Sequence, residues 1–535
     1  MHDGPPGALA PGGTIADLRP RPASRWTGRD AAALGAALLV SVGALLVNAR
    51  RTFDFFDMSG FLDAGYRVYR GQHLYVDFWY NAGPVHPALH ALSFYLFGYG
   101  QVAVLVHLAV VLAAFGAATY FLARSGAVAL SPLAAALATI LAVVAFAGPI
   151  SHPFYDLTAF TFVTVGLALY AWHLREASDR STLLAGVGAG AAAALGFMTK
   201  ANEGLAGAVS LVTLFALGPR PRRATGACIL GGVATGLVVL GCVFSPRDFI
   251  YTAFIGYKVG QRFENLSRLG QALVQTLFLP VAATGLGIAA LGGRRFLWAR
   301  RNDLALLVLV CATAIFSAWT GSIQLPSYTF ASGLLLVFVW RLVVALRAEA
   351  RPALGRAAVA LAALLTAVVA VYAVDRTARL DTWRWRNVLD GTNSPVHSDY
   401  AFTNRAFRGW RCDRMVGEGL DSALVFLEQH ARPDERLFVF PDATFIYGIL
   451  GRESWKSAPF IFHLNQGPPP GEGTMRLRRS LFSNPPEWIV LHDQLQVWFY
   501  SAQRLSAWLG IERLFKQYDV VSSRNNVWVL RYRGP

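Results

Sequence analysis

Charged residues are scarce in this chain. Only 15% of its 535 residues are Asp, Glu, Lys or Arg, whereas 54% are hydrophobic. A soluble domain usually carries about 25% charged residues. The mean hydropathy of +0.41 agrees with this contrast. The composition therefore excludes an ordinary soluble protein and favours a protein that crosses a membrane many times.

Cysteine is also rare, with four residues in the whole chain. Cys228, Cys242 and Cys311 lie inside apolar runs, and Cys412 stands alone near the C-terminus. This spacing indicates neither a disulfide framework nor a CxxC metal site.

The apolar residues fall into long runs. A helix that crosses a bilayer needs about 20 mostly apolar residues. By this rule the sequence predicts about eleven transmembrane helices, at 31–49, 101–123, 127–147, 157–173, 183–199, 203–218, 225–244, 271–291, 304–320, 327–345 and 357–374. The net charge of +16 does not indicate a nucleic-acid partner, because the arginines form short clusters between these runs.

The arginine clusters predict the orientation. With residues 1–29 as a disordered cytoplasmic N-terminus, alternate connections carry the basic residues, as cytoplasmic loops do. The cytoplasmic cations are Arg124; Arg175 and Arg180; Arg220, Arg222 and Arg223; Arg294, Arg295, Arg300 and Arg301; and Arg347, Arg351 and Arg356. The loops 50–100, 148–156, 245–270 and 321–326 and the junction 200–202 then lie outside.

An odd number of spans also places the chain after the transmembrane domain (30–374) outside the cytoplasm. Residues 375–535 contain strand-like runs at 436–440, 488–492 and 526–532, with helix-like stretches at about 419–431 and 503–516 between them. This alternation predicts an extracytoplasmic α/β domain. The fold class is thus a multi-spanning α-helical membrane protein with a C-terminal α/β domain.

The first outer loop, 50–100, is unusually polar for its surroundings. "DMSGFLDAGYRVYRG" predicts a short amphipathic helix that begins at Asp57 and ends at Gly71. "YVDFWYNAGPVHP" then turns back towards the membrane through Gly83 and Pro84. Asp57 is either a functional carboxylate or only the cap of this helix.

Other charged residues are predicted on the same face. Asp156 begins a span, so it is either a functional residue or only the cap of that helix. Lys200 ends a span, so it is either functional or only extends its side chain to the membrane interface. "YTAFIGYKVGQRFENLSRLGQ" adds Lys258, Arg262 and Arg268, unless it is only a surface helix. Carboxylates can deprotonate a hydroxyl, and cations can hold a leaving phosphate. The combination suits group transfer from a lipid phosphate.

These residues resemble the GT-C membrane glycosyltransferases, in the branch of the dolichyl-phosphate-mannose protein mannosyltransferases and the bacterial lipid A aminoarabinose transferases. The matching motifs are "DMSGF" (57–61), Gly71, "YVDF" (75–78), "GP" (83–84), "LFG" (96–98), Asp156 and "MTK" (198–200). One position departs from the family, because members often have a second acid where Met58 stands. A single carboxylate at that pair gives no indication of a metal site.

The resemblance implies a hexosyl- or pentosyltransferase that takes its sugar from a polyprenyl-phosphate donor, with inversion and with Asp57 as base. It assigns the donor phosphate to Lys200, Lys258, Arg262 and Arg268. Asp77, Asp156 and Tyr66 are the other expected donor- or acceptor-binding residues, although Tyr66 suits an interfacial anchor equally well. The lipid-linked sugar is the expected donor substrate, and a divalent metal is left open without being indicated.

Two other classes remain open, a transporter or flippase and a non-catalytic envelope-assembly protein. Transporter sites lie near the bilayer midplane between repeated halves, whereas these polar residues fall in outer loops and the sequence shows no repeat. The Ala-, Gly- and Arg-rich composition is typical of a GC-rich bacterium and predicts the inner membrane. The expected partners are membrane lipids, the lipid-linked sugar and an extracytoplasmic acceptor. The sequence identifies neither the sugar nor the acceptor.

Overall fold

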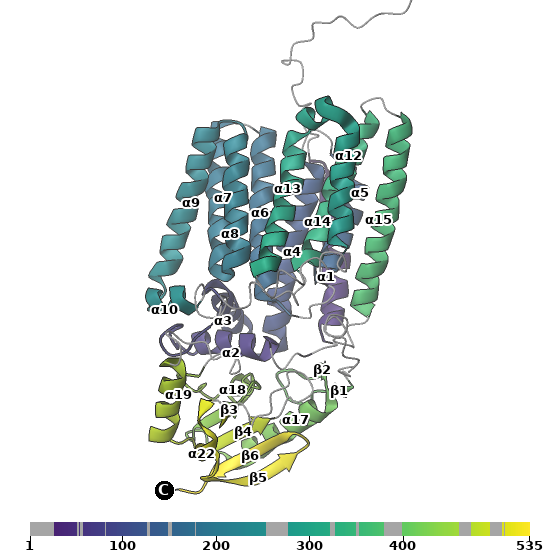
Figure 1. Cartoon of the computed structure of the whole chain (residues 1–535). Coiled ribbons are helices and arrows are strands. Elements are labelled where there is room, and N and C mark those ends of the chain that lie inside the picture. Colours follow the sequence, from purple (N-terminus) through teal and green to yellow (C-terminus); the bar gives the residue numbers. More distant parts are fainter. Residues whose placement is uncertain are drawn as a thin grey trace, which may run out of the picture.

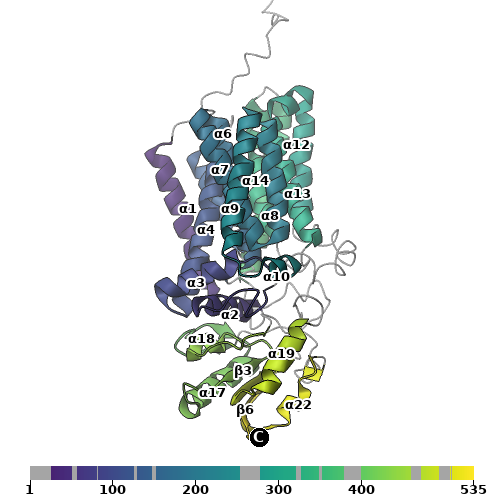
Figure 2. The same ribbon diagram turned by 90° about the vertical axis from the view of Figure 1, so that its left-hand side faces the viewer.

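A bundle of upright helices and a smaller sheet at one end of it make up the structure (Figure 1). The computed structural model describes residues 26–50, 53, 57–80, 82–125, 129–147, 152–176, 178–252, 277–320, 327–348, 352–378, 399–458, 472–492, 506–507 and 509–534. Helices α2 (Asp57–Tyr69) and α3 (Val85–Phe97) lie between the bundle and the sheet (Figure 2).

Each of the eleven predicted spans overlaps a helix of the bundle in its described residues. These helices are α1 (Gly28–Ala49), α4 (Gln101–Arg124), α5 (Pro132–Ala147), α6 (Tyr155–Glu176), α7 (Asp179–Thr199), α8 (Ala201–Leu217), α9 (Pro221–Gly241), α12 (Phe278–Ala299), α13 (Arg301–Thr320), α14 (Ser327–Ala348) and α15 (Pro352–Ala378). Seven helices in the described part are long and apolar enough to cross a membrane, and α5 and α8 are shorter apolar helices. The number of spans therefore remains a prediction.

Glycines allow the helices of the bundle to approach closely, as in the contact between α7 and α9. A Cβ atom on Gly190 would lie 1.9 Å from the carbonyl oxygen of Cys228, and one on Gly231 would lie 2.2 Å from that of Val187. Small residues at such contacts let the backbones of neighbouring helices touch. Close packing matters here because the hydrophobic effect does not drive helices together inside a membrane.

The two ends of the bundle differ. At one end Asp30 of α1 and Arg124 of α4 form a buried ion pair of 2.5 Å. At the other end the backbone N–H of Gln101, the first residue of α4, donates to the carbonyl oxygen of Ala406 in the C-terminal part, at 2.8 Å. The start of α1 and the end of α4, which carry predicted cytoplasmic cations, therefore lie away from the sheet.

The first outer loop is mostly helical. Helix α2 agrees with the predicted helix at 57–71, and Gly71 follows it with a φ of +82°, a conformation that favours glycine. Helix α3 was not predicted. The short α10 (Pro246–Ile250) follows α9 near this layer (Figure 2).

Helix α2 is buried on two sides. Phe61 and Ala64 belong to the apolar core of the bundle. Met58, Leu62 and Tyr66 belong to the core of the C-terminal part. Because the two sets lie on different faces of one helix, α2 is a shared layer that joins both parts.

The C-terminal part is built on a four-stranded mixed sheet. The strand order is β3-β4-β6-β5, with β3 parallel to β4 and the other neighbours antiparallel. Its elements are β1 (Tyr400–Ala401), β2 (Arg411–Cys412), α17 (Arg414–His430), β3 (Leu437–Phe440), α18 (Ile446–Leu450), α19 (Glu472–Ser483), β4 (Trp488–His492), α22 (Glu512–Phe515), β5 (Tyr518–Arg524) and β6 (Val527–Tyr532).

The sequence predicted β3, β4, β6 and α17 within a few residues. Strand β5 was missed, because it carries mostly exposed residues and lacks an apolar run. Of the helix predicted at about 503–516, residues 506, 507 and 509 are helical, and α22 covers Glu512–Phe515. Gly510, with a φ of +67°, interrupts the helix between them.

A buried polar contact holds α2 against the C-terminal part. Arg67 Nε lies 2.8 Å from Asp63 Oδ2, and neither side chain is exposed. The Ser454 hydroxyl donates to Asp63 at 2.5 Å, and Arg67 Nη1 donates to the carbonyl oxygen of Trp455 at 2.8 Å. Breaking a buried pair of this kind by removing one partner is strongly destabilising.

Candidate active site

Asp57 is the first residue of α2, where a negative charge interacts favourably with the positive end of the helix dipole. One turn further, Phe61 lies on the same face of the helix. Its ring centre is 4.9 Å from that of Phe154 and 5.0 Å from that of Tyr155. This face of α2 therefore meets the second outer segment, directly before Asp156.

The Gly83–Pro84 turn packs against the end of α7. The backbone N–H of Gly83 donates to the carbonyl oxygen of Thr199 at 3.0 Å. A Cβ atom at position 83 would lie 1.8 Å from the carbonyl oxygen of Met198, so no other residue fits there. Two motifs more than a hundred residues apart in the sequence are thus in direct contact.

Lys200 lies between α7 and α8 in a buried cluster of charges. Its ammonium group contacts Asp156 Oδ1 and lies 3.2 Å from Glu203 Oε1. The side chains are 6%, 0% and 1% exposed for Lys200, Asp156 and Glu203, respectively. The same ammonium lies 4.7 Å from the ring centre of Tyr155. The Lys200 side chain is therefore buried in contact with two carboxylates.

Tyr80 and His86 form a buried hydrogen-bonded pair in the first outer loop. Burial, above all, and then the neighbouring Tyr75 and Asp57 raise the pKa of the Tyr80 hydroxyl. Burial lowers the pKa of His86 to about 4, so its imidazole is neutral near pH 7. His86 Nε2 lies 2.7 Å from the carbonyl oxygen of Pro153, which can only accept, so Nε2 carries the proton. Nδ1 then accepts from the Tyr80 hydroxyl at 2.7 Å.

Three further histidines surround His86. The ring centres of His86 and His90 are 4.7 Å apart, and those of His90 and His107 are 4.5 Å apart. The ring centre of His152 is 5.8 Å from that of Phe61. The ring nitrogens of His90, His107 and His152 have no hydrogen-bond partner among the described residues. Within the same ranges no group of three or more His, Cys, Asp or Glu side chains has the arrangement of a metal site.

The structure does not bring all the predicted residues together. The side chain of Asp77 accepts from the backbone N–H of His73 at 2.8 Å and lies 3.8 Å from the Lys456 ammonium. Tyr66 lies on the other side of α2, with its ring centre 5.1 Å from that of Tyr99. Asp77 thus closes a local turn, and Tyr66 packs in the C-terminal core.

Three of the predicted cations, Lys258, Arg262 and Arg268, lie outside the described residues.

Sequence reasoning missed four residues of this region. Tyr80 and His86 lie in the polar loop that was singled out, but nothing in their spacing distinguished them. Glu203 follows Lys200 by three residues, a helical spacing that was available as a signal. Arg476 of α19 lies 5.4 Å from the ring centre of Trp79 and brings a cation of the C-terminal part to the loop. Only the tertiary structure reveals that contact.

The mostly helical chain has an ArnT-like GT-C fold. Two solved structures of ArnT from Cupriavidus metallidurans are similar to it, one bound to undecaprenyl phosphate (TM-score 0.52, 13% identity) and one in the apo state (TM-score 0.53, 16% identity). Each similarity covers 93% of this chain and 97% of the ArnT chain.

Residues 81–245 match the family described as Dolichyl-phosphate-mannose-protein mannosyltransferase. No curated protein matches the sequence. The family match and the fold confirm the resemblance to the GT-C membrane glycosyltransferases that the motifs at 57–98 and 156–200 indicated.

Proposed function

We propose that this protein is an integral membrane glycosyltransferase of the bacterial inner membrane. It moves a sugar from a polyprenyl-phosphate donor to an acceptor outside the cytoplasm. The observation that carries the proposal is the meeting of three segments: the start of α2, the Gly83–Pro84 turn, and the pair formed by Asp156 and Lys200. Segments from distant parts of the sequence thereby place carboxylates, a cation and buried aromatic rings at one end of the bundle.

In the proposed reaction the Asp57 carboxylate takes the proton of an acceptor hydroxyl. The acceptor oxygen forms a bond to the anomeric carbon of the sugar while the bond from that carbon to the donor phosphate breaks. The bonding electrons leave with the polyprenyl phosphate, and a single displacement inverts the anomeric centre. A base of this kind contributes about 10²–10⁴-fold to the rate.

Asp57 is the proposed base because it begins α2, on the face of the helix that meets Tyr155, directly before Asp156. Asp156 and Glu203 both contact the ammonium of Lys200, and Asp77 accepts a hydrogen bond from the backbone N–H of His73. Tyr80, held by His86, feels the charge of Asp57 and is a proposed positioning residue for it.

The leaving phosphate needs positive charge in a site of low dielectric. Lys200, Lys258, Arg262 and Arg268 are the proposed phosphate-binding cations. Arg476 is a further cation close to the loop that leads to Tyr80.

The position of the charged cluster argues against a transporter. Asp156 lies in the first turn of α6, and Lys200 follows the last residue of α7. Both positions are at the end of the bundle that faces the C-terminal part. A transporter is expected to bind its substrate near the midplane between two repeated halves.

The test compares envelope glycans from cells that lack the protein and from cells that carry the parent or the Asp57→Asn variant. Asn caps a helix about as well as Asp, so this variant keeps the fold but loses the base. Mass spectrometry should show one glycan species larger by a single sugar in the parent cells and at least about 100-fold less of it with the variant.

Asp179→Asn is the matched control, because Asp179 lies at the other end of the bundle and is well exposed. It should behave like the parent. Identical glycan profiles in all of these cells would refute the proposed transferase activity. A normal yield from folded Asp57→Asn protein would refute only the role of Asp57.

A further inference from the structure

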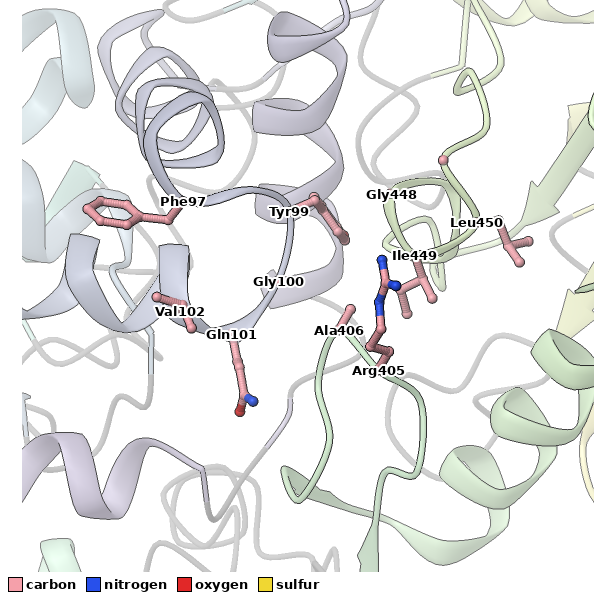
Figure 3. Close-up of a pocket in the computed structure, with 11 residues that line it drawn as sticks. Phe97, Tyr99, Gly100, Gln101, Val102, Arg405, Ala406, Gly448, Ile449 and Leu450 are labelled. Carbon is pink, nitrogen blue, oxygen red and sulfur yellow. The ribbon is translucent and has the colours of Figure 1, made fainter.

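A cavity of about 500 Å³ lies where three segments meet on the outer side of the bundle (Figure 3). The first segment is the turn between α3 and α4, at 97–102. The second is the loop between β1 and β2, at 405–406, and the third is the end of α18, at 448–451. The function proposed above uses none of these residues.

Tight contacts fix the walls of this cavity. The Tyr99 hydroxyl donates to the carbonyl oxygen of Phe445 at 2.9 Å. A Cβ atom at Gly448 would lie 2.2 Å from the Tyr99 ring, so only glycine allows this packing. The hydrogen bond from Gln101 to Ala406 closes a second side. The cavity is therefore part of the fold and not a gap between loosely placed loops.

The cavity lies at one end of a candidate membrane span. Gln101 begins α4, one of the helices that can cross a membrane, and the far end of that helix is fixed by the Asp30–Arg124 pair. Apolar side chains beside the cavity are turned outward. Tyr95 is 76% exposed, Leu96 66% and Val102 54%. Exposed apolar side chains next to the end of a span suit contact with acyl chains.

The lining favours a negative charge. Arg405 is exposed and has no ion-pair partner in the part of the chain that the structure describes. No carboxylate lines the cavity, and the first turn of α4 contains no acidic residue. Both the guanidinium and the start of a 24-residue helix attract a phosphate.

We propose that this cavity binds the headgroup phosphate of an anionic glycerophospholipid, with Arg405 as its main contact and the acyl chains beside Leu96 and Val102. The site is separate from the active site, because Tyr66 packs on Tyr99 from the face of α2 opposite Phe61. The bound lipid does not react. It links α4 to the C-terminal part and thereby stabilises their contact.

The experiment measures the thermal unfolding midpoint of the full chain, purified in a neutral detergent, against added lipid. Phosphatidylglycerol should raise the midpoint in a saturable way, whereas zwitterionic phosphatidylethanolamine and inorganic phosphate should not. Arg405→Gln should raise the half-saturating concentration of phosphatidylglycerol roughly tenfold, the loss of one charge-assisted hydrogen bond. Arg408→Gln, on the same loop but outside the lining, should leave it unchanged.

A second variant covers the case in which Arg405→Gln does not fold. Val102→Trp fills the exposed side of the cavity and should weaken the lipid effect while Arg405 remains. An equal response to phosphatidylethanolamine, a full response to inorganic phosphate, or an unchanged response in both variants would overturn the proposal. So would displacement of phosphatidylglycerol by equimolar undecaprenyl phosphate, because the cavity would then belong to the donor site. None of these outcomes depends on transferase activity.

Discussion

At the scale of single residues, Lys200 shows how burial limits a functional assignment. One ammonium faces two carboxylates, and all three side chains are almost fully buried. Such a group is stable only while its charges remain paired, because a buried unpaired ion costs several kcal/mol. A donor phosphate that binds Lys200 must therefore compete with Asp156 and Glu203, or share the ammonium with them.

The first prediction separates the structural role of Lys200 from its role in binding. Lys200→Met leaves two buried carboxylates without their cation and should destabilise the fold by roughly 3–5 kcal/mol. Adding Asp156→Asn and Glu203→Gln removes the uncompensated charges and should restore most of the unfolding midpoint in detergent. Sugar transfer by the triple variant should stay low if any of the three groups serves the reaction. A fully active triple variant would show that the cluster is only structural.

The second prediction concerns pH and the buried histidines. Burial lowers the pKa of His86 to about 4 and that of His152 to about 3, whereas an unfolded histidine titrates near 6.5. Below pH 6.5 the unfolded chain binds protons that the folded chain does not. The free energy of unfolding therefore decreases as the pH is lowered. The contribution is fully present above pH 6.5 and is lost progressively as the pH falls towards 4.

Each such histidine lowers the free energy of unfolding by about 1.4 kcal/mol for every unit by which the pH falls below 6.5 in this window. His152→Phe should therefore make the unfolding midpoint less sensitive to pH between 7.5 and 5.5, since no hydrogen bond of the ring is lost among the described residues. His430→Phe is the control, because His430 is exposed on α17. Equal pH dependence in the parent and in His152→Phe would contradict the prediction.

At the scale of elements, hydrophobic periodicity predicted most of the fold. Runs of about 20 apolar residues identified the bundle helices, because a helix that faces both lipid and other helices needs few polar residues. Helix α2 was also predicted, from its amphipathic pattern between Asp57 and Gly71. Helix α3 was missed because "VHPALHALSFYLF" is too short for a span and lies within the predicted outer loop 50–100.

The candidate site was predictable only in part. Asp57, Gly83, Asp156 and Lys200 stood out as polar or turn residues beside apolar runs. Their partners did not, since the contact of Tyr80 with His86 and of Lys200 with Glu203 depends on how the segments fold back. Periodicity reports which face of a helix is buried, but it does not report what covers that face.

The third prediction tests the contact between two of these segments. Gly83→Ala places a methyl group 1.8 Å from the carbonyl oxygen of Met198, which is backbone and cannot rotate away. The turn must shift, so the variant should lose most transfer activity and unfold at a lower temperature. Gly43→Ala is the control, because nothing lies within 4 Å of a Cβ atom there and alanine favours a helix. Parent-like behaviour of Gly83→Ala would show that this turn is not closely packed.

At the scale of the whole molecule, α2 couples the C-terminal part to the candidate site. Its Phe61 face packs on the segment before Asp156, and its Met58 and Leu62 face packs in the core of the sheet. The buried Asp63–Arg67 pair adds polar contacts to Ser454 and Trp455. The position of Asp57 therefore depends on the C-terminal part, although no residue of that part was assigned a role in the reaction from sequence.

The last prediction is the side of the membrane on which the C-terminal part lies. The start of α1 and the end of α4, with Arg124, lie at the end of the bundle away from the sheet. Cytoplasmic ends carry the excess of Lys and Arg, so the sheet should lie outside. A fluorescent protein that matures only in the cytoplasm should stay dark when fused after Pro535. The same protein fused after Glu176, at the end of α6, should fluoresce. Alkaline phosphatase, which is active only outside, should give the reverse pattern at both positions. A bright fusion after Pro535 would place the sheet and Asp57 in the cytoplasm, where a donor exposed on the outer leaflet cannot reach them.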